Sequence, residues 1–449
     1  MFKIKSTWLS SSLLSTIQRF SHTIFNFLNF MILARHLSKK EIGIWALFTI
    51  IITTFEFSKG SLLKAAHIRL VTSSHNEEEK NKISWSSLAM NSLMSILFML
   101  FIIVFSNKIS SWLNTDSELS NLFYLYIPGL ISMIFLSHYE AVLISYLNFK
   151  GLLIGTLARL ITFSGPILLY FLLHKELSLE TLMILNIISI IIGTFTLFII
   201  CYKYLTFSIQ TNKTSIKKIL KFGTFVFGTG VISNIASNID QLLTSNYLNP
   251  ISVSYYNTAS RLNGFVEIPS YAAADVLFPK FSQLSAEENQ DKINSIFEKS
   301  IALLLSLMIP IAICLIIFSK FLILIIAGAS FESANTILKI YIICSVIGII
   351  QNQSANMLTS IGRAKTCFYT NTTSIIIKII IAYIFLSYFG FYGAALATIV
   401  MTIINFTIWY FIMKRYTNIN FFHIISQIKL IYQEFYSKLY KVAFKKRVD

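Results

Sequence analysis

The sequence predicts an all-α polytopic membrane protein with about twelve transmembrane helices. Of its 449 residues, 55% are hydrophobic and only 13% are charged, about half the charged share of an average soluble domain. Long stretches therefore hold almost no polar residue that could face water, which excludes a soluble multidomain protein. The aromatic share of 14% excludes a disordered chain. The net charge is +17, but the basic residues form no compact patch, so we expect no nucleic acid partner.

The number of helices follows from the lengths of the apolar stretches, because a bilayer core of about 30 Å requires roughly 20 mainly apolar residues. The eighth stretch is less hydrophobic than the others, as expected of a helix that faces protein. A stretch from residue 320 is interrupted by a turn that we predict between Gly328 and Asn335, so the tenth span begins near Asn335. In order, the expected spans are approximately 8–34, 42–63, 83–106, 119–144, 151–173, 181–202, 220–246, 252–276, 296–318, 335–360, 366–387 and 391–413.

The distribution of Lys and Arg orients these spans. With the N-terminus inside, 26 of the 37 basic residues lie in cytoplasmic segments or at the cytoplasmic ends of spans, 6 lie outside and 5 lie deeper within spans; Arg159, counted with the cytoplasmic group, is a borderline case. Because cytoplasmic loops are enriched in Lys and Arg, the sequence predicts that both termini are cytoplasmic. The first outside loop, which carries Arg35, Lys39 and Lys40, is an exception to this rule.

The chain divides at its longest basic connector, 203–221, into an N-terminal lobe (1–202) and a C-terminal lobe (222–413), each with six spans. Residues 35–45 align with 246–256, at an offset of 211: in both, a short turn is followed by a small residue and an aromatic residue that enter a helix. This pattern indicates a duplication with parallel repeats. Residues 414–449 form a basic tail with helical periodicity. It predicts an amphipathic cytoplasmic helix that lies on the inner leaflet or packs against cytoplasmic loops.

Charged residues inside the spans are the candidate site residues, because a charge at the bilayer centre costs a few kcal/mol and usually faces protein or a wet cavity. Lys339 lies near a helix end and can reach the interface. The other four basic residues are candidates for a cationic, substrate-binding cavity, with structural ion pairs as the alternative. They are Arg19, Lys59, Arg261 and Lys378.

Three acidic residues inside the spans are candidates for ion coupling: Asp240, Glu56 and Glu267. Asp240 is the strongest of them, because the polar run 233–241 around it should face the interior. An intramembrane carboxylate is a natural H⁺ or Na⁺ site, although pairing with Arg261 or another base is equally compatible with the sequence. Glu140 lies close to the inner end of its span, where it can reach water.

No catalytic motif is present in the sequence, and we therefore do not expect an enzyme. It contains neither a glycine-rich phosphate loop nor a Ser-His-Asp arrangement at a span end. The four cysteines are scattered singly, which supports neither a zinc site nor a disulfide framework. We expect no metal and no cofactor, apart from a coupling H⁺ or Na⁺.

Four stretches carry a resemblance to a known family. They read ARHLSKKEIGIWAL (34–47), IDQ with VSYYNTASRL (239–241 and 253–262), LFPKFS (277–282) and FGFYGAALAT (389–398). In this order they resemble the Wzx-like polysaccharide flippases of the multidrug/oligosaccharidyl-lipid/polysaccharide exporter superfamily, across essentially residues 8–413. The resemblance implies two six-helix lobes around a central cavity, in a protein of the bacterial inner membrane.

The resemblance also implies a function. Such proteins flip undecaprenyl-diphosphate-linked oligosaccharide to the periplasmic leaflet for O-antigen or capsule biosynthesis, by alternating access coupled to an H⁺ or Na⁺ gradient. The implied partners are this lipid-linked substrate, membrane lipids, a polysaccharide polymerase and a chain-length regulator. Arg19, Arg261 and Lys378 would then meet the diphosphate, and Asp240 would carry the coupling ion.

Three alternatives remain. A drug or cation exporter of the same superfamily is disfavoured because the charges within the spans lean basic. A major facilitator would show a pattern of Gly, Asp-Arg and Gly-Arg in the loop that reads TSSHNE here, at 72–77. A membrane enzyme of polysaccharide assembly, such as a polymerase, is disfavoured by the short outside loops.

Overall fold

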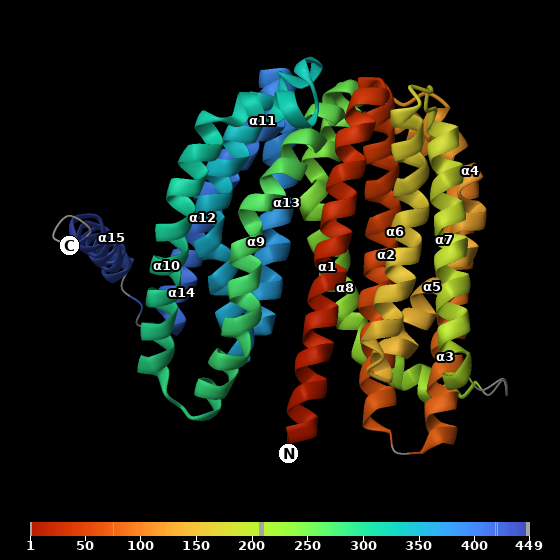
Figure 1. Cartoon of the computed structure of the whole chain (residues 1–449), viewed down its shortest axis with the longest axis horizontal. Coiled ribbons are helices and arrows are strands. Elements are labelled where there is room, and N and C mark those ends of the chain that lie inside the picture. Colours follow the sequence, from red (N-terminus) through yellow and green to blue (C-terminus); the bar gives the residue numbers. More distant parts are fainter. Residues whose placement is uncertain (1, 75, 206–210, 418, 420, 446–449) are drawn as a thin grey trace. The chain divides into compact units, whose positions relative to one another are not determined.

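The computed structural model describes residues 2–74, 76–205, 211–417, 419 and 421–445. Regular secondary structure across these residues is helical, with no strand, which confirms the all-α prediction. By its backbone packing the chain forms two compact units, Met1–Ser254 (unit 1) and Tyr255–Asp449 (unit 2). Figure 1 labels their helices.

Unit 1 contains the first eight α-helices and the first turn of the ninth. Within it α2 packs against α8, α5 and α3, while α6 packs between α1 and α7. The elements are α1 (Phe2–His36), α2 (Lys39–Ser73), α3 (Glu77–Trp112), α4 (Glu118–Leu125), α5 (Ile127–Ser145), α6 (Phe149–Leu172), α7 (Leu179–Cys201), η1 (Tyr202–Tyr204) and α8 (Lys213–Tyr247).

Unit 2 contains the rest of α9 and the helices that follow it. Within it α12 packs against α10 and α14, and α13 packs against α14. The elements are α9 (Pro250–Ala286), α10 (Gln290–Ile317), α11 (Ser319–Ile326), η2 (Ala329–Phe331), α12 (Ala334–Ser360), α13 (Ala364–Phe389), η3 (Gly390–Tyr392), α14 (Gly393–Tyr416) and α15 (Phe421–Lys445).

Local sequence signals set where these helices begin and break. Ser38 caps α2: its hydroxyl accepts from the amide of Glu41, while the Glu41 carboxylate accepts from the amide of Ser38. Pro128 stands in the first turn of α5, directly after α4 ends, so the fourth span consists of two helices. Gly328, at φ +94°, ends the short α11 segment before α12, as the predicted turn between Gly328 and Asn335 requires.

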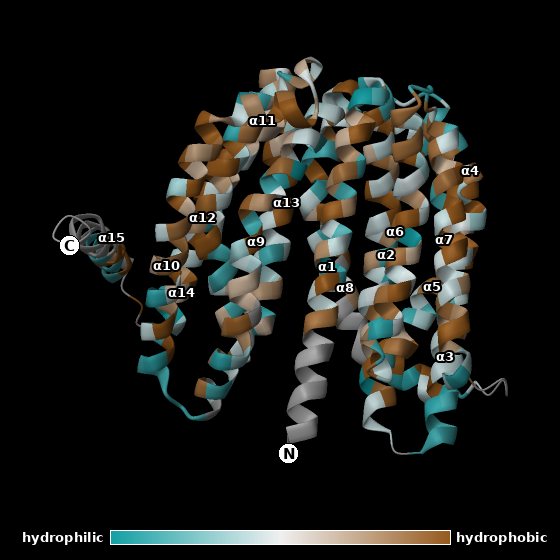
Figure 2. Ribbon diagram, viewed as in Figure 1, coloured by the Kyte–Doolittle hydropathy of each residue, from teal (hydrophilic) through white to brown (hydrophobic). Residues whose placement is uncertain are grey.

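The described helices agree with about twelve membrane crossings. Eight segments are long and apolar enough to cross a bilayer, and one of them, Ala364–Tyr416, includes both α13 and α14. The more polar α1, α8 and α9 have 35, 35 and 37 residues, and helices of that length extend about 50 Å. Figure 2 shows hydrophobic residues along the middle of the helices and hydrophilic ones around helix ends such as the α2–α3 and α9–α10 turns.

The helix boundaries also support the internal duplication. The four pairs of matching helices begin 211 to 215 positions apart: α2 and α9 at Lys39 and Pro250, α3 and α10 at Glu77 and Gln290, α6 and α13 at Phe149 and Ala364, and α7 and α14 at Leu179 and Gly393. The boundary between the two compact units nevertheless falls after residue 254 of the sequence, because α8 packs against α2 and α3 of unit 1. The division into lobes 1–202 and 222–413 stays a prediction, as does the central cavity.

The predicted amphipathic tail forms α15, which packs against α10 within unit 2. Ile424 is 3% exposed, and the Tyr432 hydroxyl donates to the carbonyl oxygen of Ser306, near the middle of α10, at 2.8 Å. Figure 1 shows α15 at a steep angle to α10. Phe422, Ile425 and Leu430 remain exposed. The tail therefore docks on a membrane-spanning helix, and its contact with the inner leaflet stays a prediction.

Candidate functional site

Lys59 and Glu56, predicted for a cationic cavity and for ion coupling, form a buried ion pair on α2. The Lys59 ammonium lies 2.7 Å from Oε1 of Glu56, with side-chain exposures of 2% and 11%. The same ammonium donates to the Ser95 hydroxyl of α3 at 3.1 Å and lies 5.2 Å from the Phe55 ring centroid. The structural ion pair, the alternative stated for Lys59, is therefore what the structure shows.

Arg19 and Asp240 are the other two predicted site residues in unit 1. Arg19 lies on α1 with an exposed side chain. Asp240 lies on α8 and is 6% exposed, next to Gln241 at 4%. The polar run of α8 thus has buried members, as we expected of a run that avoids lipid. The substrate and ion roles of these residues stay predictions.

In unit 2, Arg261 and Glu267 lie on α9, six residues apart, and have different partners. Arg261 is partly buried, and its Nε donates to Oδ1 of Asn257 at 2.8 Å. The carboxylate of Glu267 accepts from Ser345 of α12 at 3.2 Å and from the Tyr271 hydroxyl at 3.1 Å. Asn263 joins this network through Ser345, at 2.8 Å. These hydrogen bonds connect Glu267 of α9 to α12.

Lys378 lies on α13 with a partly buried side chain. Asp240 belongs to unit 1 and Arg261 to unit 2, so an ion pair between them stays a prediction. Among the seven candidates, Lys59 and Glu56 are in direct contact with each other.

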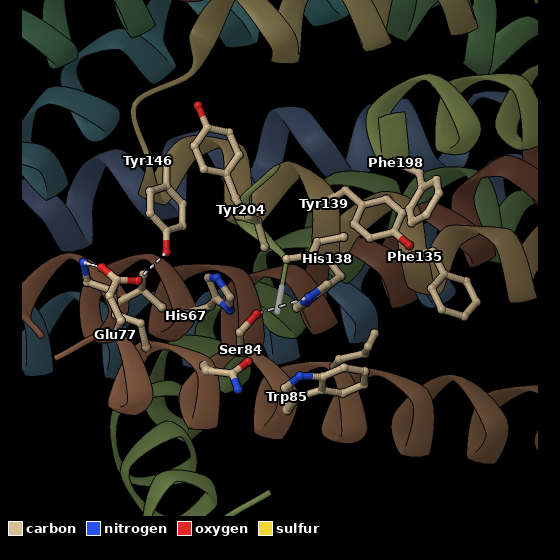
Figure 3. Close-up of a pocket in the computed structure, with 16 residues that line it drawn as sticks. His67, Glu77, Ser84, Trp85, Phe135, His138, Tyr139, Tyr146, Phe198 and Tyr204 are labelled. Atoms are coloured by element: carbon tan, nitrogen blue, oxygen red, sulfur yellow. Dashed lines mark hydrogen bonds and ion pairs between the residues drawn. The ribbon is translucent and has the colours of Figure 1, made fainter. Parts of the chain in front are cut away.

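Unit 1 also contains a cavity that the sequence did not predict (Figure 3). Its volume is about 240 Å³, and it is lined by residues of α2, α3, α5, α7 and η1. His67 and His138 are 1% and 5% exposed, and their rings meet edge to face at 5.5 Å. No local spacing links these two residues, which are 71 positions apart.

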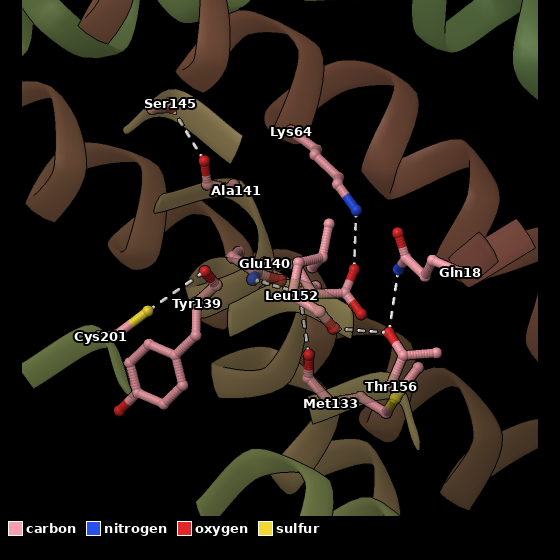
Figure 4. Close-up of polar contacts among 12 residues, drawn as sticks. Gln18, Lys64, Met133, Tyr139, Glu140, Ala141, Ser145, Leu152, Thr156 and Cys201 are labelled. Atoms are coloured by element: carbon pink, nitrogen blue, oxygen red, sulfur yellow. Dashed lines mark hydrogen bonds and ion pairs between the residues drawn. The ribbon is translucent and has the colours of Figure 1, made fainter. Parts of the chain in front are cut away.

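A second unpredicted feature is a polar seam inside unit 1 (Figure 4). Lys64 of α2 lies 2.7 Å from the Glu140 carboxylate of α5. Gln18 of α1 donates to the Thr156 hydroxyl of α6 at 2.9 Å. We expected Glu140 at the inner end of its span, where it can reach water, and its side chain is 25% exposed. No local pattern predicted the pairing of Lys64 with Glu140, because the two residues are 76 positions apart.

Together, the fold and the apolar helices define a polytopic α-helical membrane protein with charged side chains inside its spans. The chain belongs to the polysaccharide biosynthesis protein family, whose profile matches residues 32–336. Among the described residues no group of His, Cys, Asp and Glu could hold a metal ion.

Two relatives illustrate the membership. Agl15, a probable low-salt glycan biosynthesis flippase of Haloferax volcanii, is 27% identical over 198 residues; the match covers 42% of this chain and 41% of that protein. It thus spans less than half the length of either protein. A membrane protein from the cps region of Klebsiella pneumoniae is 24% identical, with 92% of this chain and 82% of that protein covered.

Two solved structures share the fold. The lipid II flippase MurJ, in an inward closed conformation, has a TM-score of 0.75 at 20% identity, covering 93% of this chain and 90% of that chain. An inward-facing multidrug resistance MATE family transporter of the MOP superfamily has a TM-score of 0.74 at 12% identity, covering 88% and 94%. At these identities the two structures show a shared fold, while the family match and the flippase name of the Haloferax relative agree with the resemblance seen in the sequence.

Proposed function

We propose that this protein flips undecaprenyl-diphosphate-linked oligosaccharide across the bacterial inner membrane for polysaccharide biosynthesis, with O-antigen or capsule as the product. Membership in the polysaccharide biosynthesis protein family is the observation that carries the proposal. The flippase name of the Haloferax relative and the cps-region origin of the Klebsiella relative support it. A polysaccharide polymerase and a chain-length regulator would act on the product.

The structure refines which cations we assign to the lipid diphosphate. The Lys59 ammonium is buried between Glu56 and Ser95, so we assign it a structural role. Arg19 is exposed, and Arg261 and Lys378 are partly buried, so we retain these three as the cations for the diphosphate. Arg261 is the best candidate, because a guanidinium can bind two phosphate oxygens side by side and Asn257 orients it through Nε.

Replacement of Arg261 tests this proposal. We expect Arg261→Ala to reduce surface polysaccharide at least tenfold in the native host, because a hydrogen bond to a charged group contributes about 1.5–3 kcal/mol. The measurement is surface glycan, with membrane insertion checked by immunoblot. Arg69→Ala is the matched control, since Arg69 is exposed near the C-terminal end of α2. Normal glycan in Arg261→Ala cells would remove Arg261 from the site.

Coupling to an H⁺ or Na⁺ gradient is part of the same proposal. Asp240 and Glu267 are the candidate carboxylates, and Glu267 already accepts hydrogen bonds from Ser345 and Tyr271. We expect flipping in proteoliposomes to accelerate when one of the two gradients is imposed, and Asp240→Asn or Glu267→Gln to abolish the acceleration. Equal rates with and without either gradient would contradict coupling.

A further inference from the structure

The cavity of unit 1 has the composition of a ligand site that the charged residues of the proposed pathway do not include. It lies among the C-terminal part of α2, the N-terminal part of α3 and the C-terminal parts of α5 and α7, with η1 beside it. By the predicted topology this is the cytoplasmic end of the unit. The cavity volume of about 240 Å³ suits a ligand of the size of one six-membered sugar ring with its hydroxyl groups.

One wall of the cavity is polar. Figure 3 shows Ser84 between the rings of His67 and His138, and its hydroxyl lies 3.4 Å from Nε2 of His138. The buried Nδ1 of His67 has no hydrogen-bond partner among the described residues. Protein covers this nitrogen completely, so the hydrogen-bonding groups that this wall offers to a ligand are those of Ser84 and His138.

The other walls are aromatic. Trp85 of α3, Phe135 and Tyr139 of α5, and Phe198 of α7 line the cavity. At the mouth, Tyr146 and Tyr204 stack at 4.7 Å with an interplanar angle of 18°. Burial raises the pKa of the Tyr146 phenol, and the nearby Glu77 carboxylate adds to the shift; the phenol donates to that carboxylate at 3.5 Å. A ligand here meets ring faces as well as hydrogen-bonding groups.

The charges at the mouth disfavour an ionic ligand. Lys80 and Glu77 pair with each other at 2.6 Å, and the Lys80 ammonium already lies over the Tyr146 ring, 5.8 Å from its centroid. An organic cation would find the aromatic mouth next to this ammonium, and an anion would compete with Glu77 for it. The chemistry therefore favours an uncharged ring with one apolar face and polar edges.

We propose that this cavity binds a single pyranose ring, whose C–H face packs on Trp85 and whose hydroxyl groups bond to the polar wall at Ser84 and His138. The ring has two possible sources, the glycan of the lipid-linked substrate and a free sugar of the cytoplasm. The first source rests on the proposed function and would make the cavity a determinant of glycan specificity. The second would make it a sugar site separate from the transported substrate.

Tryptophan fluorescence of the purified full-length protein tests the site directly. The detergent must lack a sugar headgroup, because alkyl glycosides would compete. We expect glucose, galactose or N-acetylglucosamine to change the emission saturably, and mannitol, an open-chain polyol, to have no effect. The change should disappear in Trp85→Phe. No saturable change with any of the three pyranoses, or an equal change with mannitol, would overturn the proposal.

Binding of radiolabelled sugar to variants locates the site. We expect at least tenfold weaker binding in Trp85→Ala and in Tyr204→Ala, which truncates the mouth outside the packed helices. Trp112→Ala is the matched control, since Trp112 is on the same helix, is 51% exposed and does not line the cavity; its binding should stay within twofold of wild type. Unchanged binding in both cavity variants would refute the assignment.

Surface glycan in the same variants identifies the source of the ring. Weaker sugar binding with reduced glycan in Trp85→Ala cells assigns the site to the substrate glycan, and weaker binding with normal glycan assigns it to a free sugar. Arg261 does not line the cavity, so we expect sugar binding to be unchanged in Arg261→Ala. A protein that flips no lipid-linked glycan but binds pyranoses would therefore refute the proposed function and retain the cavity site.

Discussion

At the scale of single residues, the pair of Lys59 and Glu56 shows how the protein keeps a charge inside a membrane-spanning helix. Both side chains are almost fully buried, and three groups surround the ammonium: a carboxylate, a hydroxyl and an aromatic face. Removing charges from water is costly unless geometry and hydrogen bonds compensate. The two residues therefore depend on each other.

A double-mutant cycle tests this dependence. We expect Glu56→Gln to lower the free energy of unfolding by about 3–5 kcal/mol, because it leaves the ammonium buried without a counterion. The double variant Glu56→Gln/Lys59→Met should regain most of that loss, measured by unfolding in detergent micelles. Glu77→Gln is the control: its partner Lys80 has the same spacing, but Glu77 is 74% exposed, so little change is expected. An unchanged free energy of unfolding in Glu56→Gln would contradict the burial of the pair.

At the scale of helices, close backbone contact fixes how the N-terminus of α2 packs. A Cβ placed on Gly43 would lie 1.8 Å from the carbonyl oxygen of Pro250, the first residue of α9. Only glycine permits this approach without movement of the backbone. Gly60, on the same helix, has no such neighbour within 4 Å.

These two glycines form a matched pair for mutagenesis. We expect Gly43→Ala to lower the free energy of unfolding by about 1–3 kcal/mol, because overpacking displaces neighbouring backbone. Gly60→Ala should raise it by up to about 1 kcal/mol, because alanine favours the helix. Thermal unfolding in detergent measures both. Equal effects of the two substitutions would show that α2 does not pack as described.

At the scale of the whole molecule, the net charge of +17 mainly reflects how the chain is oriented in the membrane and says less about substrate binding. The 26 basic residues counted as cytoplasmic outnumber the six outside. The exceptional first outside loop is partly neutralised, because Lys40 pairs with Asp116 at 3.2 Å and with Glu118 at 2.5 Å. The first outside loop therefore carries less net positive charge than its number of basic residues suggests.

Cysteine accessibility tests the predicted orientation. Glu176, in the α6–α7 loop, and Glu287, after α9, are both exposed and are predicted to lie outside and inside, respectively. In a background where the exposed Cys314 is replaced by Ser, a membrane-impermeant maleimide should label Glu176→Cys in spheroplasts and leave Glu287→Cys unlabelled until lysis. The reverse labelling pattern would show that the protein has the opposite orientation in the membrane.

The sequence by itself determined the all-α class, the approximate spans and the turn that begins at Gly328, because the bilayer selects contiguous apolar stretches and glycine acts locally. It also placed Glu56 and Lys59 three residues apart on one helix, a spacing that allows them to pair. Only the tertiary structure decided that they do pair, that Lys64 meets Glu140 and that five elements enclose a cavity around His67 and His138. Those contacts depend on how each helix is rotated and packed against its neighbours, and no local pattern of residues encodes that.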